Sequence, residues 1–172
     1  YLQKNGQYAD AVAEFERLIS IVPEKIAKEF AHISKREQTS LIAMERATIF
    51  DKMRLAAQRE GELNSAIYFQ ILSFAHRALG LNLQDRITEF DAFKEGDFWH
   101  DRIDSLLKKA NKEKCAGALV EQCTKYIQGC SASALTRLIT DVTTILEINS
   151  PSKKAQQGGP GYPSQGAGSP DP

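Results

Sequence analysis

Aspartate and histidine lie close together in one short stretch of the chain, where His100 is followed by Asp101 and preceded by Asp97. An aspartate–histidine pair can supply acid–base catalysis when the two side chains lie within hydrogen-bond distance. The same carboxylates also suit the positive end of a helix dipole, and we favour this structural interpretation. His32, His76 and His100 form no H-x3-H or H-E-x-x-H pattern, so they predict no zinc site.

The three cysteines, Cys115, Cys123 and Cys130, are the other candidates for metal or disulfide chemistry. On one helix they would be separated by roughly 12 and 10 Å, at a rise of about 1.5 Å per residue. A disulfide needs Cα atoms within about 7 Å, and a shared zinc ion needs similar closeness. With Leu119 and Tyr126 the cysteines instead form a stripe at near-helical spacing, which predicts small buried side chains.

Sequence motifs for enzymatic chemistry are absent from the chain. No G-x-S-x-G motif, no phosphate-binding loop and no dinucleotide-binding G-x-G-x-x-G occurs. His76 stands in the most apolar stretch of the chain, and we interpret it as a core histidine. We therefore predict a non-enzymatic protein with no catalytic residues, no cofactor and no bound metal.

The charges are balanced over the whole chain, with 22 Lys and Arg against 22 Asp and Glu. A dedicated duplex-DNA binder usually carries a basic excess, because phosphate contacts supply most of its non-specific affinity. Locally, however, Lys108, Lys109 and Lys112 form a basic run that could bind an acidic partner or phosphates. Trp99 is a second candidate for partner binding, because an exposed tryptophan often dominates the energy of an interface.

Membrane and secretion signals are also missing from the sequence given. No stretch approaches about 18 consecutive apolar residues, so we predict no membrane span. We find no secretory signal and expect a cytoplasmic protein. The chain begins at Tyr1, which indicates a fragment or a processed product.

Helical periodicity extends over nearly all of residues 1–150, and no segment is typical of a strand. Ser34 and Glu37 have the spacing of a capping box at a helix start. The stretch after Gly61 is apolar almost all round, which predicts a helix at the centre of a bundle that ends at Gly80. The predicted helices cover residues 7–22, 26–33, 34–59, 64–79, 83–94, 97–107, a cysteine helix ending at Gly129, and 133–148.

Proline usage divides the chain. Five of the six prolines lie in residues 151–172, together with many glycines, whereas residues 1–150 contain only Pro23. A segment of this composition buries too little apolar surface to offset its chain entropy, so we predict a disordered C-terminal tail. The remainder is predicted to be an all-α helical bundle or a stack of helical hairpins, with residues 1–23 and 24–150 as its two parts.

The opening segment contains an A-x3-F element between a glycine and a proline, formed by Gly6, Tyr8, Ala11, Phe15 and Pro23. It resembles the second helix of a tetratricopeptide repeat. The resemblance implies that the glycine turns the chain, the tyrosine and alanine pack on a preceding helix, the phenylalanine fills the groove and the proline ends the helix. It also implies an interaction module that binds a peptide or a partner helix in a groove between helices.

A second, partial copy of this pattern begins at Gly61 and continues through Leu63 and Ala66. It follows Gly6 by 55 residues, against a repeat length of about 34. The array therefore ends or degenerates here, or the opening match is a chance helical hairpin. As an alternative, residues 59–82 look like the central helices of phage small terminase subunits, which implies a helical, nucleic-acid-associated protein.

Overall fold

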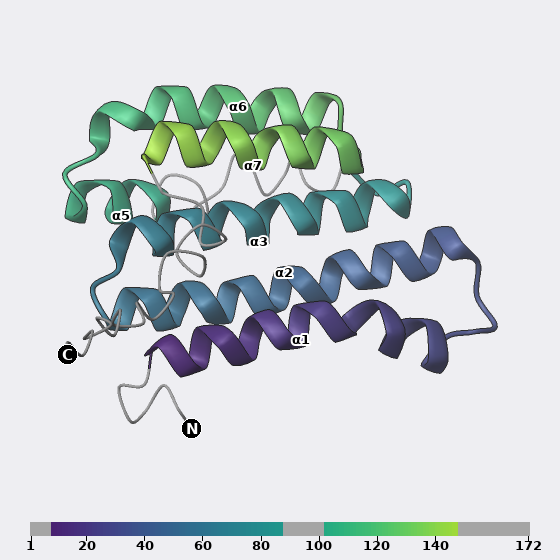
Figure 1. Cartoon of the computed structure of the whole chain (residues 1–172). Coiled ribbons are helices and arrows are strands. Elements are labelled where there is room, and N and C mark those ends of the chain that lie inside the picture. The colour runs from purple at the N-terminus through teal and green to yellow at the C-terminus, as the bar shows by residue number, and fades with distance from the viewer. Residues whose placement is uncertain (1–7, 88–101, 148–172) are drawn as a thin grey trace, which may run out of the picture.

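The computed structural model describes residues 8–87 and 102–147, and within these ranges the chain forms helices and no strand (Figure 1). The elements are α1 (Tyr8–Glu29), α2 (Lys35–Arg59), α3 (Leu63–Leu83), α5 (Asp104–Lys109), η3 (Glu113–Cys115), α6 (Ala116–Gln128) and α7 (Ala132–Leu146). This confirms the predicted all-α fold. The expected disordered tail, residues 151–172, lies outside the described residues.

Helix α3 lies at the centre of the fold. Helices α1, α2 and α3 follow one another side by side, with α2 packed between the other two (Figure 1). Helices α5, α6 and α7 pack against α3 from its other side, and α6 pairs with α7. Twelve of the residues in α3 are buried, which confirms the prediction that this nearly all-apolar helix occupies the middle of the bundle.

The predicted helix ends that depend on local capping chemistry are confirmed. The Glu37 amide donates to the Ser34 hydroxyl over 3.2 Å, and the Ser34 amide donates to the Glu37 carboxylate over 2.8 Å. Gly61 follows α2 with a φ of +78°, a conformation that favours glycine. Helix α6 ends at Gly129, as predicted. The last helix was predicted to begin at residue 133, whereas α7 begins at Ala132 and is capped by Ser131, whose hydroxyl accepts a hydrogen bond from the Ala134 amide.

The prediction that Pro23 ends the first helix is wrong, because α1 continues through this residue to Glu29. A proline inside a helix costs about 3 kcal/mol, since it removes one hydrogen bond and crowds the preceding turn. Val22 and Ile26, on either side of the proline, are 5% and 2% exposed. Burying one such side chain contributes about 1.5–3 kcal/mol, so packing offsets the local penalty. The expected boundary between residues 23 and 24 therefore falls inside a helix.

The predicted helix end at Gly80 is also wrong, because α3 runs on to Leu83. A Cβ atom at Gly80 would lie 2.8 Å from the Cγ and Sδ atoms of Met44 and 3.3 Å from the carbonyl oxygen of Ser40. The Ser40 hydroxyl donates to the Gly80 carbonyl over 2.9 Å. The glycine thus allows α2 and α3 to approach closely rather than terminating a helix.

The interior consists of two apolar clusters that share α3. One cluster joins α3 to α5, α6 and α7 and also includes Ala43 and Ala57 of α2, and the other joins α1 and α2 to α3. The Tyr126 side chain lies within the first cluster, and its hydroxyl donates to the Ala75 carbonyl over 2.7 Å. Within residues 8–87 and 102–147, no helix has both the length and the apolar character of a membrane span.

Candidate functional site

The residues that carry the tetratricopeptide resemblance project from α1, apart from Gly6, which lies outside the described residues. Ala11 is buried, and Tyr8 and Phe15 are half-buried. Helix α1 packs on α2, the helix that follows it, and Tyr8 lines a small pocket together with Ala56 near the end of α2. The preceding helix on which the resemblance places Tyr8 and Ala11 would be formed by residues 1–4, which lie outside the described residues, so that packing stays a prediction.

The partner-binding candidates predicted from the basic run have different surroundings. Lys108 and Lys109 are exposed in the last turn of α5. The Lys112 ammonium group instead donates to the Leu146 carbonyl over 2.8 Å and lies 3.9 Å from the Glu147 carboxylate. Lys112 thus caps the end of α7 and is engaged within the protein. Three further candidates for binding or catalysis lie outside the described residues, together with Asp97: Trp99, His100 and Asp101.

His76 is buried in the core, as predicted, but its Nδ1 atom has no hydrogen-bond partner in the described part of the chain, whereas a satisfied core histidine was expected. Its side chain is 7% exposed, and its ring stacks on Phe50 with 5.2 Å between ring centroids. Burial, together with the nearby Arg46 guanidinium, lowers the pKa of His76 to about 4. The imidazole is therefore neutral at pH 7 and contributes packing rather than charge.

The cysteine interpretation is confirmed at the centre of the stripe. Cys123, Leu119 and Tyr126 are buried in α6, whereas Cys115 and Cys130 are partly buried at either end of the helix. Burial raises the pKa of the Cys123 thiol, which keeps it protonated. In the described part of the chain, no group of three or more His, Cys, Asp or Glu side chains could hold a metal ion.

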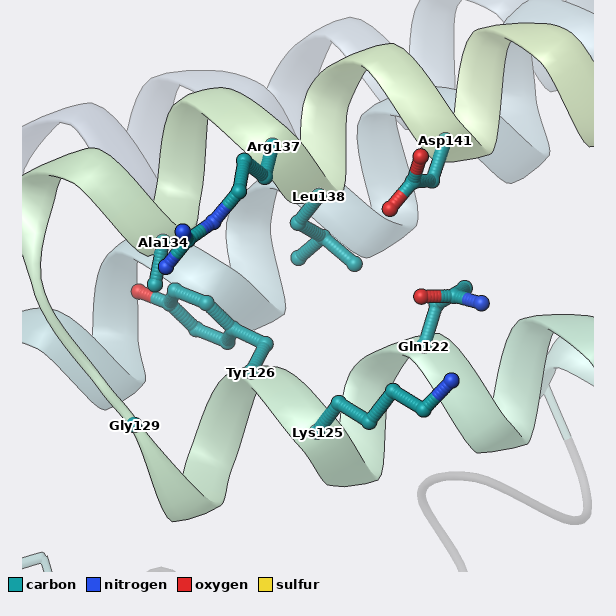
Figure 2. A pocket seen from close by; sticks show the side chains of 8 residues that line it. All are labelled: Gln122, Lys125, Tyr126, Gly129, Ala134, Arg137, Leu138 and Asp141. Carbon is teal, nitrogen blue, oxygen red and sulfur yellow. The ribbon is translucent and has the colours of Figure 1, made fainter.

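Among the described residues, one surface feature with the geometry of a binding site is an open groove between α6 and α7, with a volume of about 260 Å³ (Figure 2). Each helix contributes four residues at the i, i+3, i+4 and i+7 positions of one face. The α6 wall is formed by Gln122, Lys125, Tyr126 and Gly129, and the α7 wall by Ala134, Arg137, Leu138 and Asp141.

The floor of this groove is apolar and fixed in place. Leu138 is 2% exposed and Tyr126 is 3% exposed, and both belong to the cluster that contacts α3. The hydrogen bond from Tyr126 to the Ala75 carbonyl holds the phenol ring in one position. Because Gly129 ends α6 and Ser131 starts α7, the two walls meet through a short turn. The groove is therefore preformed by the core rather than by a loop.

The rim of the groove is polar and its charges are arranged unevenly. Arg137 lies above Tyr126 near the turn, whereas Asp141 lies one helical turn further along and faces Gln122 across the groove (Figure 2). Lys125 is paired with Glu121 over 2.6 Å. The lining carries two cations, Lys125 and Arg137, and one anion, Asp141, and Glu121, which lies outside the lining, balances the charge of Lys125. The groove thus suits a ligand with both signs of charge better than a polyanion.

Sequence reasoning missed this groove, although part of its signal was visible. The spacing of Gln122, Lys125 and Tyr126 is the helical period, and Arg137, Leu138 and Asp141 repeat it. What the sequence did not reveal is that α6 and α7 lie side by side and bring these two faces together.

Comparisons of the chain with protein-family profiles, with curated proteins and with solved structures found no match. The resemblances to tetratricopeptide repeats and to small terminase subunits therefore stay predictions.

Proposed function

We propose that this chain is a non-enzymatic interaction module that binds a peptide or a partner helix in the groove between α6 and α7. The observation that carries the proposal is the pair of helical faces in Figure 2, which place a polar rim around an apolar floor. Protein interfaces are commonly built this way, with a buried apolar centre inside a polar edge. The cytoplasmic location expected from the sequence remains a prediction.

The rigidity of the groove supports binding rather than catalysis. Tyr126 and Leu138 are held by the core, so ordering the site on binding costs little conformational entropy. The Tyr126 hydroxyl is committed to the Ala75 carbonyl, and burial raises its pKa, so it is a poor proton donor or acceptor for a substrate. The polar side chains on the rim, Gln122, Lys125, Arg137 and Asp141, can contact the surface of a partner.

Nucleic acid was the alternative partner considered from the sequence. The terminase-like stretch, residues 59–82, falls mostly on the buried helix α3, which leaves little of it for contact with DNA. The charges that line the groove sum to zero once the Glu121 paired with Lys125 is included, and one of the three lysines in the basic run is engaged at the end of α7. These observations favour a protein partner.

A selection experiment tests the proposal. A phage-displayed library of helical peptides with one randomised face is panned against the protein, and the dissociation constants of enriched peptides are measured by fluorescence anisotropy. Gln122→Trp places a large ring on the groove wall, and Val120→Trp is the matched control, because Val120 is 50% exposed on α6 and does not line the groove. We expect Gln122→Trp alone to abolish binding. Failure to enrich any peptide, or equal binding by both variants, would overturn the proposal.

A further inference from the structure

The two ends of the groove carry opposite charges that remain available for a ligand. Arg137 and Asp141 stand four residues apart on α7, so their Cβ atoms are about 6 Å apart, a spacing at which side chains on one helix often pair. Within the described parts of the chain, neither forms an ion pair, and Figure 2 shows their charged groups at opposite ends of the groove. Lys125, by contrast, is already paired with Glu121.

The walls of the groove favour a helical ligand over an extended one. Both walls are helices, and their backbone amides and carbonyls are hydrogen-bonded within α6 and α7. An extended segment entering the groove would lose water from its own backbone groups and find no backbone partners there, which is costly. A helix satisfies its backbone internally, and its side chains form ridges that fit the i, i+4 spacing of both walls.

We propose that the groove binds one α-helix of a partner protein, which presents a carboxylate to Arg137, a cation to Asp141 and a short apolar side chain to Leu138 between them. This inference rests on the proposed function and names the chemistry of the partner. The carboxylate and the cation lie at least about one helical turn apart on the partner, because Arg137 and Asp141 are one turn apart on α7 and their charged groups point to opposite ends of the groove.

The magnitude of the expected selectivity follows from the exposure of the charges. An exposed ion pair changes a binding constant by about 1.5- to 5-fold, and a like-charge contact has a similar effect in the opposite sense. Exchanging the two charged residues of the partner helix replaces two attractions by two repulsions. The exchanged peptide should therefore bind at least about five-fold more weakly than the original.

The test is a charge exchange on both sides of the interface. The tightest peptide from the library and its charge-exchanged twin are each titrated into the wild-type protein and into the double variant Arg137→Asp with Asp141→Arg. Both positions are exposed, so the variant should fold, and circular dichroism checks this. The wild-type protein should prefer the original peptide, and the double variant should prefer the twin by a similar factor.

Each outcome distinguishes this inference from the proposed function. If peptides bind in a manner blocked by Gln122→Trp but both proteins prefer the same peptide, the groove binds helices and the charge pattern proposed here is wrong. If no peptide binding depends on the groove, both proposals fail. If sedimentation shows that the protein self-associates and Gln122→Trp abolishes this, the occupant is a second copy of the chain and the inference is overturned.

Discussion

His76 should make the protein lose stability as the pH falls from about 6.5 to about 4. The imidazole is 7% exposed against Phe50, and burial beside Arg46 lowers its pKa from 6.5 to about 4. Because the folded state binds the proton less readily than the unfolded state, the stabilisation from the neutral ring is complete above pH 6.5. It is lost progressively as the unfolded state becomes protonated, and the loss is complete near pH 4.

The size of this effect follows from the two pKa values. Each unit by which the pKa is lowered is worth about 1.4 kcal/mol, so the complete loss is about 3 kcal/mol, of which about 2 kcal/mol has occurred by pH 5. The complete loss is about one fifth to three fifths of the 5–15 kcal/mol that stabilises a typical domain. The effect should therefore be visible in an ordinary unfolding titration.

The assay is urea unfolding of the wild-type protein and His76→Phe between about pH 7.5 and pH 4.5, analysed by linear extrapolation. Phenylalanine can still stack on Phe50 but cannot take up a proton. Carboxylates such as Glu37, whose pKa is lowered by its hydrogen bonds to Ser34, titrate in both proteins and cancel in the difference. The wild-type protein should lose about 2 kcal/mol more than the variant on going to pH 5. Identical pH profiles would refute the reasoning.

Three substitutions test a proline within a helix, a helix cap and the packing of two helices, all by the same unfolding measurement. Pro23→Ala should raise the free energy of unfolding by about 1–3 kcal/mol, because it restores a helix hydrogen bond; a loss would show that the proline serves the fold. Ser34→Ala should lower it by about 1 kcal/mol by breaking the capping box with Glu37, and an unchanged value would contradict the cap. Gly80→Val should lower it by at least about 1–3 kcal/mol, because its side chain would collide with Met44, and tolerance would contradict the close approach of α2 and α3.

The parts of the fold that could be predicted from the sequence are those decided by neighbouring residues. The capping box at Ser34, the left-handed glycine at Gly61 and the helix end at Gly129 all depend on contacts within about five residues. The central position of α3 also followed from its composition, because a helix that is apolar all round must be covered all round.

The two errors arose where distant contacts outweigh local preference. Proline disfavours a helix interior, and Pro23 therefore predicted a helix end. The burial of Val22 and Ile26 offsets this local cost, so α1 continues beyond Pro23. Glycine is common at helix ends, and Gly80 therefore predicted one. In the structure, the absence of a side chain at Gly80 leaves room for Met44 on α2. In both cases the deciding atoms belong to another helix, whose position is not visible in a local window of sequence.

The candidate site was beyond sequence reasoning for a related reason. Arg137 and Asp141 look like an ordinary exposed pair on one helix, and Tyr126 looks like part of a cysteine stripe. Only the pairing of α6 with α7 places them around one groove. The basic run was chosen on charge alone, which could not show that Lys112 is engaged at the end of α7.

The most direct test of the central claim, that the groove between α6 and α7 receives a partner helix, is a two-dimensional ¹H–¹⁵N NMR titration with the selected peptide. The account predicts that the amide signals that move most belong to residues 122–141, while those of α1 stay in place. Signals that move chiefly along α1 and α2, or uniformly over the whole protein, would contradict it.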